Sequence, residues 1–487
     1  MEVRRVKRLK DIVIVGGGTS AWLTAAYLSN NHDIRVTVID KEIGNPIGVG
    51  EATLLNFKDF LDKCNLPIED WFNKISATSK VGILFPDWVK KGHDIWHPFA
   101  MNYWIGGLSG VTKYDLWSSN QHLDFKKHGS LLYDLSVTHE KINSNLKVGY
   151  HIDCGKLTTF IQSALERRVN FIQSEMTHFD RDGSGNISLL HLKNGKSITG
   201  DLFIDCTGFL QLLKNKPVRK NLDNRLICDT AVAGRIDEED IKPYVNCTAK
   251  PSGWIWHIPT QERLGTGYVF NRSLMHEDVA KQELSNHHNG KIKPEDMKVL
   301  NWKPYYNENP WHENVVSIGL SAGFIEPLES TGLALIIEGV HQLSSQIKDT
   351  TYNTKSGELY NHIMSQYFES CIDFVGSHYT ISDRDEPFWQ EAKSHIKISD
   401  RQNYYMDMLK NPNTSISCHV NDWSFLTDGN WTTWLIQQGC EVAKRNINGS
   451  LERLDKENHV NPLQNPLFGI NNKDYMKYLS KKYTRSI

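Results

Sequence analysis

The chain has 487 residues, more than a typical single domain, so two or three sub-domains or one large interwoven unit are expected. Its 55 Lys and Arg nearly balance 57 Asp and Glu, which favours neither nucleic acid nor an anionic membrane as a partner. No apolar stretch approaches the ~18 residues of a membrane-spanning helix, and no secretory signal precedes the first predicted strand.

The eight cysteines are scattered and include no C-x-x-C pair. This spacing argues against a zinc site or a disulfide framework, and it favours reduced thiols in a cytoplasmic protein. We therefore predict a cytoplasmic location and no metal site. A homo-oligomer stays possible.

The chain begins with a strand, turn, helix and strand in the order typical of dinucleotide-binding folds. An apolar, β-branched run over 11–15 predicts a buried parallel strand, a helical pattern follows over 22–28, and a second strand is expected over 35–39. The turn between the first strand and the helix carries G-x-G-x-x-A, and an acidic residue follows the second strand. In this setting the motif predicts a dinucleotide site.

Each residue of this motif has a physical task. Gly16 permits the tight turn, Gly18 lets the backbone approach a pyrophosphate, and Ala21 allows the helix to pack closely on the strand. The helix N-terminus stabilises phosphates through its free N–H groups and its dipole. Asp40 is expected to accept hydrogen bonds from an adenosine ribose.

Two later strand-to-turn segments favour FAD over NAD. One is the strand and small-residue turn over 202–209, and the other is the segment 315–323, whose turn contains Gly319 and Gly323. Both resemble the elements with which glutathione-reductase-type flavoproteins close over FAD, although each alone could be an ordinary βα turn. We predict an α/β fold: a glutathione-reductase-type, Rossmann-like FAD-binding module with a mainly helical substrate sub-domain.

We expect the FAD-binding module to occupy residues 1–350 in discontinuous segments, with a substrate-facing insertion near 95–150, and the substrate sub-domain to occupy 351–487. The C-terminal part is rich in aromatic residues, which either recognise a substrate or form a core packed against the flavin module. These residues are Tyr404, Tyr405, Trp423, Phe425, Trp431 and Trp434.

Midway along the chain, Trp254-Ile-Trp256-His-Ile-Pro259 fits the pattern W-x-W-x-I-P. Two indoles and a proline within six residues form a bulky, stiff wall that could keep a substrate away from a reactive ring. The alternative is an edge strand with core tryptophans that ends at a proline.

Several motifs in order along the chain resemble those of the flavin-dependent tryptophan halogenase family. They are W-x-W-x-I-P, the family's flavin strap at 47–53, its lysine segment at 80–88, F-x-x-P-x-x-S-x-G at 324–332 and a further segment at 378–389. The resemblance places four strap residues at the flavin: Gly50, Glu51, Ala52 and Thr53. Glu51 is expected to be structural or coupled to the flavin.

The resemblance implies that a separate flavin reductase supplies FADH2, which reacts with O2 so that a halide is oxidised to hypohalous acid. Backbone N–H groups of Thr331 and Gly332 are expected to bind the halide, because converging amides bind anions without a formal charge. Alternatively, Ser330 to Gly332 cap a helix that begins near Leu333, and both can hold at once.

The same resemblance gives Lys80 and Glu329 catalytic roles. The Lys80 amine would hydrogen-bond hypohalous acid or form a haloamine, and burial would lower its pKa. Glu329 would stabilise an arenium cation or accept its proton. The alternatives are a solvated lysine and a surface glutamate that opens a helix.

The substrate is the least constrained part of the prediction. His97 and Phe99 resemble the family's positions that sandwich an indole, while Trp254 and Trp256 would separate flavin from substrate. An aromatic clamp also suits a phenol or a pyrrole, and the C-terminal segment does not match the tryptophan-specific pattern, so free tryptophan is doubtful. We expect a small electron-rich aromatic substrate, free or carrier-bound.

Two other functions stay open from the sequence. A flavin monooxygenase would hydroxylate an aromatic substrate without halide, and Lys80 or the pair Thr331 and Gly332 would then be incidental. A catalytically silent flavin-binding protein is disfavoured by the intact pair of Lys80 and Glu329.

Overall fold

The computed structural model of the chain describes residues 7–41, 50–99, 141–142, 148–214, 218–237, 241–411, 424–426, 428–441, 470–471 and 481. Three groups of residues with sequence predictions lie outside these ranges. They are residues 47–49 of the flavin strap, most of the insertion near 95–150, and Trp423.

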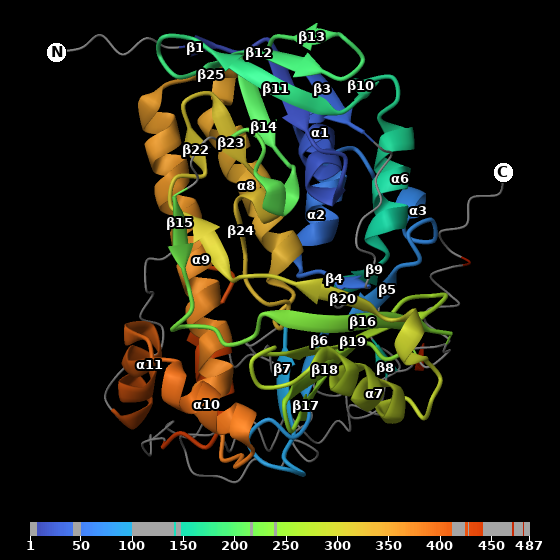
Figure 1. Ribbon diagram of the computed structural model, residues 1–487, viewed down its shortest axis with the longest axis vertical. Coiled ribbons are helices and arrows are strands. Elements are labelled where there is room, and N and C mark those ends of the chain that lie inside the picture. Colours follow the sequence, from blue (N-terminus) through green and yellow to red (C-terminus); the bar gives the residue numbers. More distant parts are fainter. Residues whose placement is uncertain are drawn as a thin grey trace, which may run out of the picture.

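A six-stranded sheet in the order β10-β3-β2-β14-β23-β22 lies in the upper part of the molecule in Figure 1. Its strands are β2 (Asp11–Val15), β3 (Arg35–Asp40), β10 (Val169–Gln173), β14 (Leu202–Asp205), β22 (Trp311–His312) and β23 (Val315–Ser317). All neighbouring strands are parallel except β22 and β23. This order confirms the Rossmann-like prediction, because β14 lies directly between β2 and β23.

The first helix, α1 (Thr19–Asn31), follows β2 and packs against α6 (Cys154–Ala164) and α8 (Thr331–Gln346). The predicted helix over 22–28 lies inside α1, which begins earlier because Gly18 already stands at its N-cap. Every residue from Ala21 to Leu28 is buried. The helix that follows the glycine turn is therefore held on several sides, which fixes the position of its N-terminus.

A seven-stranded sheet lies below the parallel sheet in Figure 1, in the order β20-β16-β19-β18-β17-β6-β7. Its strands are β6 (Gly82–Phe85), β7 (Ile95–Pro98), β16 (Thr230–Ile236), β17 (Val245–Lys250), β18 (Gly253–Pro259), β19 (Leu264–Phe270) and β20 (Lys298–Asn301). The W-x-W-x-I-P motif occupies β18, which pairs with β17 and β19. The alternative is wrong that this is an edge strand, but it is confirmed that the segment is a strand with buried tryptophans that ends at Pro259.

Smaller sheets complete the β-structure. They pair β1 (Lys7–Arg8) with β25 (Thr351–Tyr352), β8 (Lys141–Ile142) with β26 (Ile470–Asn471), β12 (Ile187–Leu192) with β11 (Met176–Arg181) and β13 (Ser197–Ile198), β21 (Tyr305–Asn307) with β15 (Arg219–Asn221) and β24 (Gly323–Phe324), and β9 (Gly149–Ile152) with β4 (Glu51–Ala52) and β5 (Thr78–Lys80). Short helices are α2 (Asn56–Lys63), α3 (Ile68–Trp71), η1 (Gly208–Leu210), η2 (Pro294–Asp296), η3 (Gly319–Ser321) and η4 (Lys348–Thr350). The sheet β4-β9-β5 matters most here, because it joins the strap to the strand that carries Lys80.

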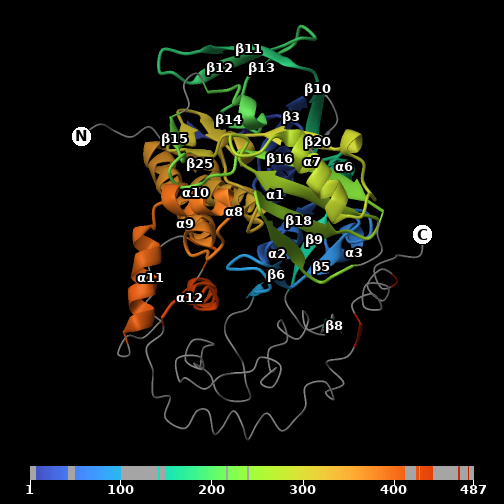
Figure 2. The same cartoon turned by 60° about the horizontal axis from the view of Figure 1, so that its bottom comes forward.

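The described part of the chain after residue 350 is mainly helical. Its helices are α9 (Thr354–Thr380), α10 (Pro387–His395), α11 (Asp400–Lys410) and α12 (Asp428–Gln437). In Figures 1 and 2 they gather on one side of the molecule, away from α7 (Glu277–His287) on the seven-stranded sheet. The long helix α9 also packs on α8 and on β22, so the boundary at residue 350 stays a prediction.

Large aromatic side chains fill the core between α9 and the seven-stranded sheet. Tyr405, Trp431 and Trp434 belong to this buried core, which favours the packing interpretation of those C-terminal aromatics. Tyr404 is 40% exposed, and Phe425 stacks on Tyr367 at a ring-centroid distance of 4.7 Å. Among the described residues, no helix is long and apolar enough to cross a membrane.

Candidate active site

The glycine turn after β2 forms a cradle that fits a dinucleotide. Gly16 has a φ of 115°, and a Cβ there would lie 2.3 Å from the carbonyl oxygen of Cys206. A Cβ on Gly17 would lie 2.2 Å from the Asp40 carboxylate, so this position, left open by the G-x-G-x-x-A pattern, also requires glycine. A Cβ on Gly18 would meet nothing within 4 Å. The space in front of the α1 N-terminus is therefore open to a phosphate group.

The two later glycines have different surroundings. Gly319 has a φ of 80°, and a Cβ there would lie 2.7 Å from the Cβ of Ser20 in the glycine turn. A Cβ on Gly323 would instead collide with the rings and side chains of Phe368 and Tyr306. Gly319 thus adjoins the dinucleotide cradle, whereas Gly323 packs into the α9 side of the molecule.

The strap residues form β4 and its continuation. Gly50 has a φ of 81°, and a Cβ there would lie 3.2 Å from the Cα of Gly265 in β19. The Glu51 carboxylate accepts a 3.1 Å hydrogen bond from the N–H of Cys154, and burial raises its pKa to about 7. Thr53 accepts a 2.8 Å hydrogen bond from the N–H of Tyr150. Ala52 is buried in the same strand, and together these contacts fix the strap to β9.

Lys80 lies where the chain passes from the strap sheet into the seven-stranded sheet. It is the last residue of β5, and β6 begins two residues later. The side chain is 0% exposed, and its apolar neighbours Val81, Ile83 and Phe85 are also fully buried. The solvated-lysine alternative is therefore wrong for this residue.

The Lys80 ammonium has partners from two distant segments. It donates a 2.8 Å hydrogen bond to Ser330 Oγ and a 3.5 Å hydrogen bond to the carbonyl oxygen of Thr53, and it lies 4.7 Å from the centroid of the Phe99 ring. Burial lowers the pKa of Lys80 to about 7, although the nearby Glu329 carboxylate opposes that shift. A substantial fraction of the amine is therefore neutral near pH 7.

Ser330 stands at the N-cap of α8 but does not cap it. Its φ of 58° is left-handed, and its side chain makes no capping hydrogen bond. The helix begins at Thr331, not near Leu333 as predicted. A Cβ on Gly332 would meet nothing within 4 Å, so the first turn of α8 adjoins open space beside the Lys80 contact.

Glu329 is buried and held by two histidines. It is 2% exposed, which excludes the surface-glutamate alternative. His97 Nδ1 lies 2.9 Å from one carboxylate oxygen, and His378 Nε2 lies 2.7 Å from the other. Burial disfavours the carboxylate, but the two histidines outweigh this and lower the pKa of Glu329 to about 2.

His378 contacts acceptors through both ring nitrogens. Its Nδ1 lies 2.7 Å from the carbonyl oxygen of Phe374, and its Nε2 lies 2.7 Å from the Glu329 carboxylate. Burial lowers the pKa of His378, and the Glu329 carboxylate opposes that shift. His97 differs, because its Nε2 accepts a 2.8 Å hydrogen bond from the Asn430 amide.

The two motif tryptophans form a continuous buried wall. Their ring centroids are 6.3 Å apart, and Trp254 Nε1 donates a 3.0 Å hydrogen bond to the Tyr379 hydroxyl. Tyr379 in turn donates to Glu326, a buried carboxyl whose pKa burial raises to about 8. A Cβ on Gly267 would lie 2.1 Å from the Trp256 ring, so β19 supports the indole closely.

Comparisons with known proteins decide the family. The tryptophan halogenase family model matches residues 11–449 of the chain. The chain belongs to the tryptophan halogenase family. It is therefore a flavin-dependent halogenase, as the ordered motifs predict.

Named relatives of this halogenase cover most of its length. The 7-chloro-L-tryptophan 6-halogenase KtzR of Kutzneria sp. (strain 744) is 30% identical, with 79% of this chain and 82% of that protein aligned. The tryptophan 7-halogenase RebH of Lentzea aerocolonigenes is 28% identical over 87% of this chain and 86% of its own length. The crystal structure of the tryptophan 6-halogenase SttH of Streptomyces toxytricini has a TM-score of 0.85 at 23% identity and covers 98% of this chain and 100% of that one, which shows the shared fold.

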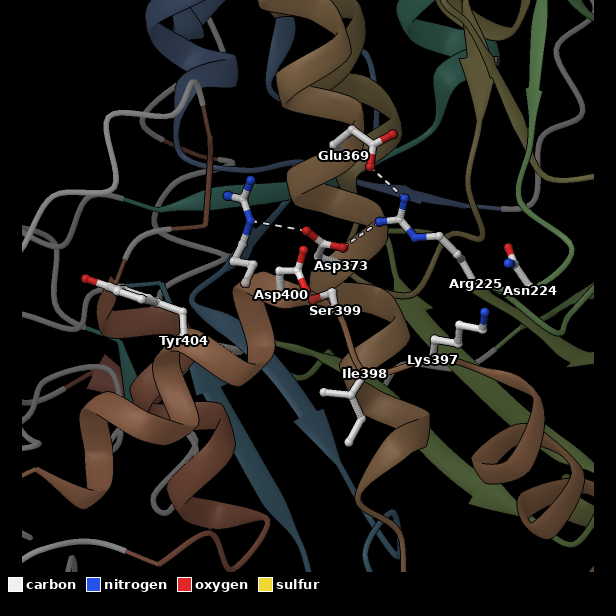
Figure 3. Close-up of a pocket in the computed structure, with 10 residues that line it drawn as sticks. Asn224, Arg225, Glu369, Asp373, Lys397, Ile398, Ser399, Asp400 and Tyr404 are labelled. Atoms are coloured by element: carbon white, nitrogen blue, oxygen red, sulfur yellow. Dashed lines mark hydrogen bonds and ion pairs between the residues drawn. The ribbon is translucent and has the colours of Figure 1, made fainter.

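The halogenase also has a charged pocket of about 670 Å³, shown in Figure 3. Arg225 lies between Glu369 and Asp373, and Arg401 lies 3.2 Å from the other oxygen of Asp373. Tyr404, one of the C-terminal aromatic residues considered for substrate recognition, lines this pocket, but none of the predicted catalytic, cofactor-binding or halide-binding residues does. We do not assign it to the reaction.

The structure also brings together residues that the sequence did not single out. Ser330 was considered only as a helix cap, while His378 and Tyr379 were quoted only as part of a family segment. Nothing in the local sequence around His378 and Tyr379 indicates a contact with Glu329 or Trp254, because both contacts depend on tertiary packing. The adjacency of Ser330 to Glu329 in the chain was the one available signal.

Proposed function

We propose that this chain halogenates an electron-rich aromatic compound with FADH2, O2 and a halide, and that Lys80 delivers the halogen. The observation that carries the proposal is the buried Lys80 amine, which hydrogen-bonds both Thr53 of the strap and Ser330 before α8. The strap would adjoin flavin, and the start of α8 would adjoin halide. A single amine that contacts both segments is well placed to receive an oxidised halogen.

FAD would be held by residues of the cradle and the strap. These are Gly16, Gly18, Ala21, Asp40, Gly319, Gly50, Glu51, Ala52 and Thr53. Gly323 would contribute less directly, because it packs against Phe368 and Tyr306. The open space at Gly18 fits the pyrophosphate, and the close contact between Gly319 and Ser20 fits a turn that covers it. Bound FADH2 supplies the reducing equivalents with which O2 is used to oxidise halide to hypohalous acid.

The halide would lie at the start of α8. The N–H groups of Thr331 and Gly332 are among the first of the helix, which have no partner within it, and the helix dipole favours an anion there. The open space beside Gly332 leaves room for the ion. Ser330 does not compete, because its hydroxyl accepts from Lys80 and makes no cap hydrogen bond.

Lys80 would act as a nucleophile or as a hydrogen-bond donor. Its neutral amine can displace hydroxide from hypohalous acid: the nitrogen–halogen bond forms as the oxygen–halogen bond breaks, and a proton from nitrogen neutralises the hydroxide. The ammonium form can instead hydrogen-bond intact hypohalous acid. A pKa of about 7 leaves both forms available near neutral pH.

Glu329 would stabilise the cationic intermediate of aromatic substitution. Because the two histidines lower its pKa to about 2, its carboxylate is ionised near neutral pH. An arenium ion is a strong acid, so even this weak base can accept its proton, while the fixed negative charge stabilises the cation before that step. His97 and His378 act as positioning residues, because they hold the carboxylate.

The substrate would be an indole, phenol or pyrrole near Phe99 and the Lys80 amine. The names of the relatives above favour an indole. Phe99 is partly exposed and its ring faces Lys80, as a substrate-contacting group requires, whereas His97 is 4% exposed and committed to Glu329 and Asn430. Trp254 and Trp256 would separate the substrate from the flavin and so disfavour direct hydroxylation.

The test is a mass-spectrometric halogenation assay. It would contain a flavin reductase, NADH, FAD, air, chloride, bromide or iodide in turn, and a panel of indoles including free tryptophan, phenols and pyrroles. We expect a halide-dependent mass shift that Lys80→Ala reduces on the order of 10³-fold or more, with FAD binding unchanged. Lys74→Ala is the matched control, since Lys74 also lies over a phenylalanine ring, 5.2 Å from Phe160, but outside the site.

The other outcomes separate the rival functions. Oxygen insertion without halogen would indicate a flavin monooxygenase. Retained halogenation in Lys80→Ala would overturn the role of Lys80 while leaving the halogenase assignment intact. A protein that binds no FAD and leaves the whole panel unchanged would contradict the proposed function.

A further inference from the structure

Three histidines meet on the seven-stranded sheet, away from the proposed site. His257 belongs to β18, His287 is the last residue of α7, and His288 follows it as the C-cap. One donor atom of each lies within 4.8 Å of the others. The ring centroids are 5.2 Å, 4.8 Å and 5.0 Å apart, so each ring contacts both of the others.

The cluster lies on the opposite face of β18 from the tryptophan wall. Side chains alternate along a strand, so His257 and Ile255 point away from Trp254 and Trp256. Ile255 packs in a separate apolar cluster with Leu284 of α7, which confirms that α7 covers this face. Figure 1 shows α7 beside β18 at the lower right.

Two of the three imidazoles offer a lone pair. The Thr266 hydroxyl donates a 2.8 Å hydrogen bond to the carbonyl oxygen of Trp256, so it must accept the 2.9 Å hydrogen bond from His288 Nε2. His288 therefore carries its proton on Nε2 and leaves Nδ1 free. His257 Nε2 is buried and has no hydrogen-bond partner among the described residues.

Burial also keeps these rings unprotonated. It lowers the pKa of His257 to about 3 and the pKa values of His287 and His288 to about 4 each.

We propose that His257, His287 and His288 bind one divalent transition-metal ion, with Zn²⁺ preferred, which ties the end of α7 to β18. Zn–N bonds of about 2.0–2.1 Å in tetrahedral geometry place histidine ring centroids roughly 5 Å apart, as here. A water molecule would complete a four-coordinate shell. Three neutral nitrogen ligands suit Zn²⁺, Cu²⁺ or Ni²⁺ and do not suit Ca²⁺ or Mg²⁺.

Lys250 is the internal competitor for this site. Its ammonium lies 2.9 Å from His287 Nδ1, and it must move away or lose its proton before this nitrogen can bind a metal ion. Its flexible side chain is half-buried at the end of β17, which allows such a movement. Replacement of Lys250 by a neutral residue of similar length should therefore tighten metal binding.

The site connects to the tryptophan wall through one hydroxyl. His288 donates to Thr266, and Thr266 donates to the backbone of Trp256. Metal ligation of His288 would polarise its Nε2–H and strengthen this chain of hydrogen bonds. The ion would thus stabilise β18 from the face opposite the tryptophan wall, without contacting flavin or substrate.

The experiment uses the full chain without a histidine tag, stripped with a chelator and titrated with Zn²⁺ by calorimetry. We expect one saturable site per chain and a rise in Tm with Zn²⁺. His257→Gln and His288→Gln should each weaken the binding at least tenfold, and Lys250→Met should tighten it. His276→Gln is the matched control, because His276 precedes the same helix, is exposed, and lies outside the cluster.

Three results would overturn the proposal. They are wild-type protein that binds no stoichiometric Zn²⁺, a cluster variant that binds as tightly as His276→Gln does, and Co²⁺-loaded protein without the strong visible bands of four-coordinate cobalt. If His257→Gln does not fold, His288→Gln and the wild-type titration still decide the question. The outcome is independent of halogenation, since none of these measurements uses a halide or a substrate.

Discussion

Lys80 is a fully buried amine whose partners come from two segments far apart in the chain. A buried ionisable group costs stability and therefore indicates a functional site when no carboxylate pairs with it directly. The Glu329 carboxylate nearby is committed to two histidines. Burying the Lys80 amine without a carboxylate bonded to it costs free energy. This cost is consistent with the catalytic role proposed for Lys80.

Lys80→Met should abolish halogenation and stabilise the fold. The pKa shift from 10.5 to about 7 corresponds to roughly 5 kcal/mol of destabilisation near neutral pH, against about 1–3 kcal/mol for leaving Ser330 Oγ unpaired. Because the pKa is lowered in the folded state, the destabilisation is fully present below pH 7 and vanishes above pH 10.5. Thermal unfolding should show a Tm raised by about 2 °C at pH 7 and lowered by about 1–2 °C near pH 10.5, where only the loss of the Ser330 hydrogen bond remains. A lower Tm at pH 7 would contradict the assigned burial cost.

The pH dependence distinguishes the two forms of Lys80. If the neutral amine reacts, halogenation per FADH2 consumed should rise with pH through about 7 and then level off. If the ammonium only hydrogen-bonds hypohalous acid, the yield should fall over the same range. Lys80→Arg, which stays charged, should be inactive in the first case and partly active in the second. Product and hydrogen peroxide measured together between pH 6 and 9 would decide.

At the scale of elements, the important feature is how turns bring separate strands to one place. The dinucleotide cradle needs β2, β14 and β23 side by side, and the parallel register of the six-stranded sheet provides this. The chain then leaves β23 through Gly319 and enters α8 at a left-handed Ser330. These two backbone conformations set where α8 starts relative to the cradle.

Gly319→Ala should weaken FAD binding without unfolding the protein. The new Cβ would require a left-handed alanine and would collide with Ser20 at 2.7 Å. We expect the Kd for FAD, measured by flavin fluorescence, to rise at least tenfold. Gly183→Ala is the control, because a Cβ there meets nothing within 4 Å. Equal affinities in the two variants would remove Gly319 from the cofactor site.

The sequence predicts these elements well where the pattern is local. The strands at 11–15 and 35–39, the helix after Gly18 and the strand at 254–259 each carry a continuous periodic or motif signal. Ser330 resembles an ordinary helix cap in the sequence, but its side chain makes no cap hydrogen bond and instead accepts one from Lys80, 250 residues away. Contacts such as His378 with Glu329 depend on how α9 packs, which no local pattern contains.

At the scale of the whole molecule, one bound FAD would contact segments from both ends of the FAD-binding module. The cradle includes the turn at 16–21, the strand end at 205–206 and the turn at 319. A ligand that contacts several segments stabilises the folded state as a unit. The division between FAD-binding and substrate sub-domains stays a prediction; α9 packs on α8 and β22 as well as on α10 and α11.

FAD should therefore stabilise the whole chain in one transition. At a hundredfold excess over its Kd, the ligand adds about 2.7 kcal/mol, which for a chain of this length corresponds to about 2–3 °C in Tm. Riboflavin, which lacks the pyrophosphate and adenosine, should have little effect, since Gly18 and Asp40 would be left without a partner from the ligand. Equal shifts with FAD and riboflavin in a calorimetric scan would contradict the proposed cradle.

The strand order also has a consequence for how the protein is made. During synthesis β2 emerges first, but its neighbour β14 follows only after residue 202, and β23 only after residue 315. At about 5–20 residues per second, roughly ten to forty seconds pass before β14 can pair with β2, and more before β23 can pair with β14. Through this interval β3 is the only sheet neighbour that β2 can have, so we expect chaperones that cover the apolar strand to raise the yield of folded protein in a foreign host.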